Sequence, residues 1–207
     1  MVTFKLIGAL LLFFPLFVFG SNTQGIKIKV IENNAISIKV DKADKSLVDL
    51  SIKDRYGSIL FNEKLSEIEL NKKQYRLEDF KVGKYTIQIE YDQLIQVQKL
   101  DFKHDKIEML DEIETIFKPT INFNNEYVDL NLLSLDNSKV EVKIRDFNNN
   151  TIYSGKFFSC PTVAKRFNTA LLEDGDYLFS VSMENNAIES NYTREFEIRD
   201  HQIRSIH

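Results

Sequence analysis

Residues 80–90 of the chain read FKVGKYTIQIE, and residues 172–182 read LEDGDYLFSVS. In both stretches a large apolar residue is followed three positions later by Gly and, two positions after that, by Tyr. Each stretch then has an apolar residue at every second position, which is typical of a half-buried antiparallel strand. The two stretches lie 92 positions apart, so the sequence predicts an internal repeat that carries this motif once per copy.

The same offset relates the residues around the motif. Residues 48–52 read VDLSI and residues 140–144 read VEVKI, with apolar and polar positions in the same phase. A turn follows in both copies, with Gly57 in one and Asn149 in the other, and both residue types tolerate positive φ. The pattern continues in this way across residues 36–91 of the first copy.

Each copy therefore contains about seven short strands with no helical periodicity between them, which predicts an all-β fold of two tandem antiparallel β-sandwiches of the immunoglobulin or fibronectin type III kind. The first strand of the second copy contains Pro119, so it should be an edge strand or be broken there. The last hairpin aligns Phe102 with Phe196 if the second copy is two residues longer, with the extra residues at positions 183–187. The first-copy strands are expected at residues 26–31, 35–41, 47–53, 58–63, 73–78, 84–91 and 95–102.

The chain divides into a leader at residues 1–20, a first sandwich at 21–108 and a second at 109–207. The leader has one early charge and an apolar run, shorter than the ~20 residues that span a bilayer, and it ends in small residues suited to signal peptidase cleavage after Gly20. We therefore expect a secreted, periplasmic or cell-surface protein with no membrane span after cleavage. Residues 103–112 form a charged linker that could extend the flanking strands, and the polar tail at 199–207 is expected to fray.

The pattern V-x-L-x-I-x-D-x-x-G-x-I-L over residues 48–60, followed by F-x-x-G-x-Y-x-I-x-I over residues 80–89, resembles small β-sandwich modules of secreted Bacteroidetes proteins. These include the C-terminal sorting domains of type IX secretion and related domains of unknown function. The resemblance implies an exported, non-catalytic role. The chain differs from sorting domains because it has two copies, no cargo domain and no Pro-Asn-Pro opening.

Composition excludes several classes of function. The formal net charge is −4 and the lysines are dispersed, so the chain provides no positive electrostatic potential that would bind a nucleic-acid backbone. The single cysteine, Cys160, cannot form an internal disulfide, and we interpret it as a small half-buried side chain, although an intermolecular disulfide stays open. The three histidines lie in the linker or tail, so neither a zinc site nor a Cys–His nucleophile is expected. No enzyme activity and no cofactor are predicted.

The repeated motif is interpreted as structural. Gly83 and Gly175 would permit a tight turn, and the hydroxyls of Tyr85 and Tyr177 would bond to upstream backbone, as in a tyrosine corner. A catalytic role for these tyrosines would need a partner that the sequence does not place nearby. Oxygen-rich turns leave a calcium site open, with candidates at Asp54, Asp146, Asn148, Asn149, Asn150, Glu173, Asp174 and Asp176.

Two functions fit these observations. The first is a structural, adhesion or protein-interaction module that contacts another protein at the envelope, through an exposed sheet edge. The alternative is a carbohydrate-binding module, which the absence of Trp disfavours. An accessory role in a type IX-like secretion pathway is a second alternative. The oligomeric state is left open.

Overall fold

The computed structural model describes residues 26–32, 35–41, 45–77, 80–104, 106–135, 138–184 and 189–206. The predicted leader lies outside these residues. No helix in the described part of the chain is long and apolar enough to cross a membrane.

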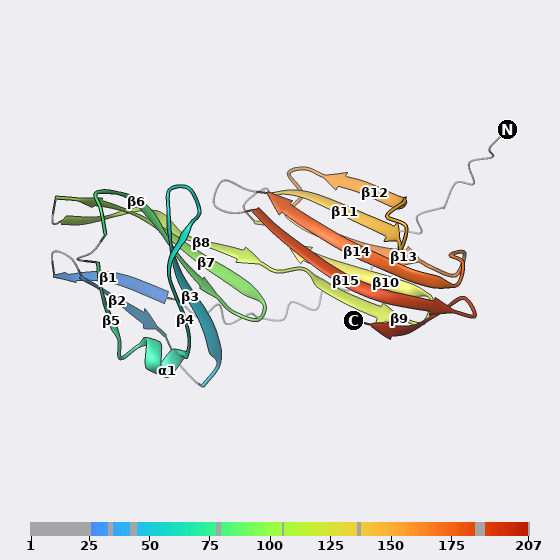
Figure 1. Ribbon diagram of the computed structural model, residues 1–207, viewed down its shortest axis with the longest axis horizontal. Helices are drawn as coiled ribbons and strands as arrows, with labels where there is room; N and C mark the ends of the chain where they lie inside the picture. Colours follow the sequence, from blue (N-terminus) through green and yellow to red (C-terminus); the bar gives the residue numbers. More distant parts are fainter. Residues whose placement is uncertain are drawn as a thin grey trace.

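The first repeat is a sandwich of two antiparallel sheets (Figure 1). The smaller sheet has the order β1 (Ile26–Glu32), β2 (Ala35–Val40), β5 (Gln74–Arg76). The larger has the order β4 (Ile59–Ser66), β3 (Leu47–Asp54), β6 (Gly83–Glu90), β7 (Leu94–Lys103), β8 (Lys106–Phe117). Side chains from both sheets, including Ile36, Ile38, Leu50 and Ile87, fill one core.

The second repeat has the same plan. Its smaller sheet has the order β13 (Thr162–Asn168), β10 (Tyr127–Leu133), β9 (Thr120–Asn124). Its larger sheet has the order β12 (Thr151–Phe157), β11 (Lys139–Asp146), β14 (Gly175–Glu184), β15 (Glu189–Arg199), β16 (Gln202–Ile206). The prediction of two tandem, all-β sandwiches of the immunoglobulin or fibronectin type III kind is confirmed.

Three details of the prediction are wrong. Among the described residues each repeat has eight strands, because β8 and β16 add a fifth strand to the larger sheet, and β16 occupies the tail that was expected to fray. A short helix, α1 (Glu67–Leu70), follows β4. The sequence feature that indicates this helix is a capping box. The Ser66 hydroxyl accepts a hydrogen bond from the backbone N–H of Glu69, and the Glu69 carboxylate accepts one from the backbone N–H of Ser66.

The third detail is the register of the last hairpin. Tyr85 pairs with Leu100, and Tyr177 pairs with Phe196, so Leu100 corresponds to Phe196. The second copy is therefore four residues longer here instead of two. Because side chains alternate with a period of two, a slip of two residues leaves the apolar pattern unchanged, and the sequence could not distinguish the two alignments.

Pro119 interrupts the chain as predicted. Strand β8 ends at Phe117, and β9 begins at Thr120 as an edge strand of its sheet. Proline has no backbone N–H to donate to a ladder, so the chain leaves one sheet here and enters another. The predicted linker at residues 103–112 forms the β7–β8 turn and the first half of β8, so the boundary drawn at residues 108/109 falls inside this strand.

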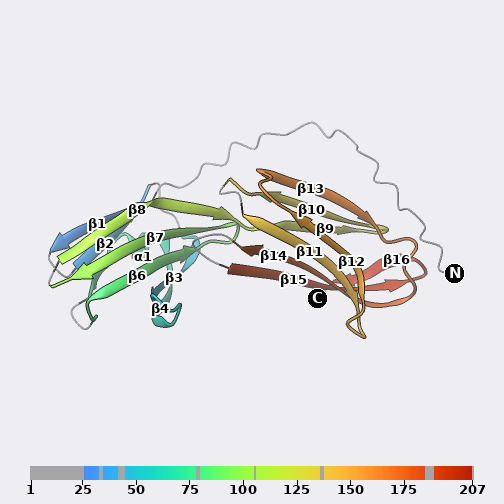
Figure 2. The ribbon, with the colours of Figure 1, turned by 90° about the horizontal axis from the view of Figure 1, so that it is seen from above.

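The β7–β8 ribbon contacts both cores. Leu100 and Phe102 of β7 lie in the first core, whereas Ile95 and Val97 lie in the second. Successive side chains of a strand point to opposite faces, so the two cores lie on opposite faces of this ribbon. Ile116 of β8, the cross-strand partner of Ile95, also lies in the second core. Figure 2 shows the ribbon passing from one sandwich into the other.

A β-bulge lies where the ribbon changes cores. Lys99 pairs with Leu110 and Val97 pairs with Glu114, so only Gln98 stands opposite three residues of β8. Asp111, inside the bulge, has φ of 57°. The buried Gln98 amide donates to the backbone carbonyl oxygens of Leu110 at 2.7 Å and Asp111 at 3.3 Å, which satisfies groups that the irregular ladder would otherwise leave unpaired.

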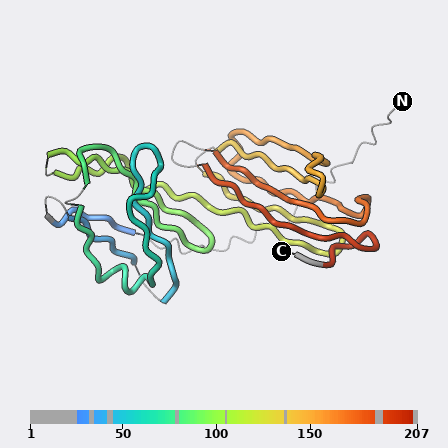
Figure 3. The backbone as a smooth tube through the Cα atoms, in the orientation of Figure 1, coloured from blue at the N-terminus to red at the C-terminus, as the bar shows by residue number. Residues whose placement is uncertain are grey.

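Equivalent ends of the two sandwiches meet at the junction. On one side is the β6–β7 turn at residues 91–93, and on the other is the beginning of β15. This arrangement follows from β8, which returns the chain to the end of the first sandwich where that turn lies (Figure 3). In the second sandwich the β11–β12 turn lies away from the junction, whereas the β3–β4 turn projects from the side of the first sandwich (Figure 1).

Candidate interaction surfaces

The repeated motif forms a tyrosine-to-backbone hydrogen bond in each sandwich. The Tyr85 hydroxyl donates to the carbonyl oxygen of Lys81 at 2.5 Å, and the Tyr177 hydroxyl donates to that of Glu173 at 2.8 Å. Burial raises the pKa of both hydroxyls, and nearby carboxylates raise it further. A tyrosine held neutral with its hydroxyl engaged by backbone is suited to fixing a turn, not to acid–base chemistry.

The glycines of the motif have a backbone conformation that other residues rarely adopt. Gly83 has φ of 157° and Gly175 has φ of 154°. A Cβ built at either position would contact no atom within 4 Å, so the requirement for Gly comes from the backbone and not from crowding. Both glycines begin the strand that carries the tyrosine, as the repeat suggests.

Two of the aspartates considered as calcium ligands form hydrogen bonds within their own turns. The Asp54 carboxylate accepts from the backbone N–H groups of Tyr56 and Ser58 at 2.8 and 2.9 Å. The Asp146 carboxylate accepts from the backbone and the side-chain amide of Asn150, both at 2.8 Å, and these bonds lower its pKa. Gly57 and Asn149 both have positive φ in these turns, as predicted.

The other candidate chemistry is dispersed. Within the ranges described above, no three His, Cys, Asp or Glu side chains gather as a metal-binding group would. The Cys160 thiol is partly buried and donates to the carbonyl oxygen of Phe158 at 3.3 Å. His104 and His201 are exposed in the β7–β8 and β15–β16 turns, and His207 lies outside the described residues.

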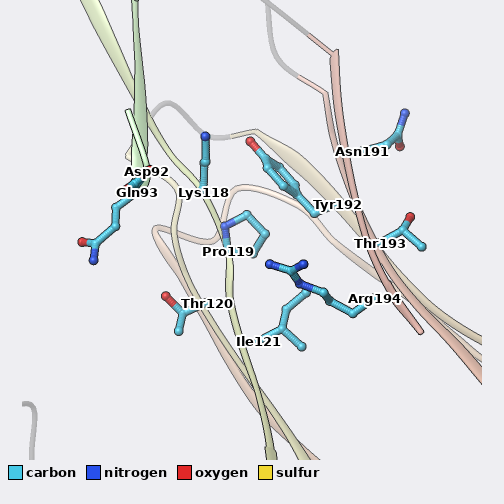
Figure 4. A pocket seen from close by; sticks show the side chains of 10 residues that line it. All are labelled: Asp92, Gln93, Lys118, Pro119, Thr120, Ile121, Asn191, Tyr192, Thr193 and Arg194. Carbon is cyan, nitrogen blue, oxygen red and sulfur yellow. The ribbon is translucent and has the colours of Figure 1, made fainter. Parts of the chain in front are cut away.

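A polar cleft of about 470 Å³ lies at the junction (Figure 4). No local sequence pattern marks this cleft, because its walls come from segments far apart in the chain. One wall is the β6–β7 turn with the connection from β8 to β9, and the other is β15. Its lining residues are Asp92, Gln93, Lys118, Pro119, Thr120, Ile121, Asn191, Tyr192, Thr193 and Arg194.

Lys118 links this cleft to the first sandwich. Its ammonium lies 2.8 Å from the Glu90 carboxylate, and its backbone N–H donates to the carbonyl oxygen of Gln93 at 2.9 Å. The lysine side chain is only 18% exposed, so solvent screens this ion pair only in part. Burial raises the pKa of Tyr192, so its hydroxyl is neutral, and the hydroxyl oxygen itself is buried. The cleft therefore offers amide, hydroxyl and guanidinium groups to a small polar molecule.

Two edge strands present apolar side chains to solvent. Strands β4 and β12 each border a larger sheet. Leu60 in β4 is 47% exposed, and Ile152, its counterpart in β12, is 48% exposed. Beyond the end of β12, Phe158 is also exposed. Both edges have unpaired backbone groups on their outer side, which can accept another strand.

Exposed aromatic rings do not form a row. Within the described residues, the exposed ones are Tyr56, Phe147 and Phe158, which lie in three different connections between strands. Phe147, in the β11–β12 turn, is 84% exposed. A sugar-binding platform of adjacent flat rings is therefore not seen on the described surface.

Comparison with known proteins identifies no family. No family model matches the chain, and no curated protein matches it. Similar solved structures include a two-domain fibronectin type III segment of chicken tenascin, which is 10% identical with a TM-score of 0.30 and is matched over 84% of this chain and 98% of that one. A β-glucuronidase of Parabacteroides merdae is 11% identical with a TM-score of 0.32, over 81% of this chain and 29% of that enzyme. The BSP domain of a biofilm-associated protein is 15% identical with a TM-score of 0.23, over 81% and 28%.

These similarities are too low to bear on function. The fold assignment rests instead on the strand order of the four sheets and on the two buried cores.

Proposed function

We propose that the chain is an exported, non-catalytic interaction module that contacts another protein of the cell envelope through its open sheet edges. The observation that carries the proposal is the pair of equivalent edge strands, β4 and β12, with outward apolar side chains at the same position of each repeat. A partner strand added to such an edge gains main-chain hydrogen bonds, and apolar side chains at alternate positions give it specificity.

Of the two edges, β12 has fewer features that prevent another strand from pairing with it. Natural edge strands avoid unwanted pairing by carrying charges, Pro or bulges. The outward positions of β12 include Ile152, Ser154 and Lys156, and only Lys156 among them is charged. In β4, Lys64 is an outward charge and Glu63 is an inward one, and inward-pointing charges also protect an edge. We therefore infer that β12 is the principal contact.

The test places charge on the edge. Ile152→Lys together with Ser154→Lys should abolish capture of the partner from an envelope extract by the purified mature chain. Leu133→Lys is the matched control, because Leu133 is an exposed apolar residue of β10, which is paired on both sides. Equal loss of capture in the control and the edge variant, or unchanged capture in the edge variant, would show that β12 is not the contact.

The junction cleft supports a second candidate, carbohydrate binding. Its hydroxyl, amide and guanidinium groups could hydrogen-bond a sugar, and Tyr192 offers a ring face beside them. Binding to a polysaccharide array that is lost in Arg194→Ala would favour this function. An absence of binding across the array would exclude it for the sugars tested.

Export and the resemblance to type IX sorting modules supply the cellular part of the proposal. N-terminal sequencing of the mature protein from its native host should begin at Ser21 if the leader is cleaved after Gly20. An accessory role in type IX-like secretion predicts that cells lacking this protein export less cargo. Normal cargo export in such cells would leave the envelope interaction as the proposed role.

A further inference from the structure

Charges at equivalent positions of the two tyrosine corners are reversed. Lys81 corresponds to Glu173, and Lys84 corresponds to Asp176, at the constant offset of 92. All four side chains are exposed. The backbone is conserved between the copies around the Gly and Tyr positions, so the reversal concerns the surface alone.

In the first sandwich, the exposed residues form a basic corner, defined here by Arg55, Tyr56, Lys81, Val82 and Lys84. The β3–β4 turn and the β5–β6 connection meet here, because Asp54 pairs with Tyr85 and the Tyr85 hydroxyl bonds to Lys81. The Arg55 guanidinium lies 4.6 Å from the centre of the Tyr56 ring. Glu78 and Asp79 precede this corner in the sequence and lie outside the described residues, so the definition does not include them.

In the second sandwich, the same two connections form an acidic corner, defined here by Phe147, Leu171, Glu173, Asp174 and Asp176. Asp146 pairs with Tyr177, and the Tyr177 hydroxyl bonds to Glu173, so the same two connections meet. Phe147 and Leu171 are 84% and 82% exposed. Large apolar side chains this exposed, beside charged residues, are typical of a protein interface.

We propose that the basic corner of one copy binds the acidic corner of a second copy. The two corners belong to different sandwiches, and neither includes a residue that lines the junction cleft. Two different surfaces of one chain make a heterologous contact, which extends into an open chain unless rotation closes it into a ring. The occupant of each corner is therefore another copy of this protein, and each copy contacts the next from corner to corner.

Charge and apolar contact have separate roles in this contact. The opposite charges select basic-to-acidic pairing and disfavour contacts between two like corners. Phe147 and Leu171 supply the apolar surface that is removed from water against Tyr56 and Val82. Because the charges are exposed, the association should weaken as salt is raised.

Sedimentation velocity of the full mature chain over a range of concentrations tests the proposal. Wild-type protein should form larger species with increasing concentration, and fewer of them in high salt. Lys81→Glu with Lys84→Glu, and separately Glu173→Lys with Asp176→Lys, should each raise the apparent dissociation constant at least about tenfold. A mixture of the two variants should associate again, because an intact acidic corner then meets an intact basic corner.

Lys27→Glu with Lys156→Glu is the matched control for the basic-corner variant, with the same change of net charge on exposed lysines outside the corners. It should associate as wild type does, and so should the β12 edge variant, so failure of the edge proposal leaves this one standing. Circular dichroism verifies that each variant folds. The proposal is overturned if wild type stays monomeric at all concentrations, if the control associates as weakly as the corner variants, or if the mixture does not recover.

Discussion

Replacing Ile116 with Ala should destabilise the second sandwich, although Ile116 lies in a strand that is hydrogen-bonded into the first. Its side chain is 3% exposed and belongs to the second core. The substitution removes three buried carbons, worth about 0.8 kcal/mol each, and leaves a partial cavity. We expect a loss of about 3 kcal/mol, equivalent to about a hundredfold faster hydrogen exchange where exchange requires the second sandwich to unfold.

Hydrogen exchange followed by mass spectrometry measures this loss separately in each sandwich. With Ile116→Ala, peptides from β10, β11 and β14 should exchange faster, while those from β2 and β3 change less. Ile107→Ala is the matched control, because Ile107 lies in the same strand but in the first core. It should produce the opposite distribution. If Ile116→Ala accelerates exchange only in the first sandwich, the assignment of β8 to both cores is wrong.

Three further predictions concern single positions. Gly83→Ala should lower the free energy of unfolding by about 1–3 kcal/mol through backbone strain at positive φ, measured by urea denaturation, and an unchanged midpoint would contradict that reason. Asp111→Val should destabilise by about 1–2 kcal/mol while Asp111→Asn is tolerated, since only the bulge requires φ of 57°, and a regular strand would favour Val. The pKa of Asp146 is lowered by Asn150, so its contribution is present above the unfolded pKa and lost as pH falls through the folded pKa. Asp146→Asn should therefore flatten the decline of melting temperature below about pH 4, and an unchanged pH profile would argue against this bond.

Most of the fold could be predicted from the sequence because its strands alternate apolar and polar residues with a period of two. Residues 48–52 alternate strictly, and Val48, Leu50 and Ile52 are all buried. Pro119 gave the break between β8 and β9, because a missing N–H has the same consequence in any sheet.

The parts that were missed depend on long-range geometry. Strand β8 carries charged residues among its apolar ones, since it is an edge strand and much of its surface meets solvent. One sequence feature does indicate that β7 contributes to both cores. The apolar residues occupy odd positions at Ile95 and Val97 and even positions at Leu100 and Phe102, so the two pairs point to opposite faces. The cleft and the two corners combine segments whose proximity no local pattern encodes.

The arrangement of the two sandwiches forms the cleft and separates the two corners, and spin-label distances test it directly. In a Cys160→Ser background, labels at Gln93 and Asn191 lie across the junction, whereas Phe147 lies in the β11–β12 turn, which is away from the junction. The Gln93–Asn191 pair should give a single short distance, and the Gln93–Phe147 pair a single longer one. A Gln93–Phe147 distance shorter than the Gln93–Asn191 distance would mean that the sandwiches follow one another head to tail, and would contradict the account.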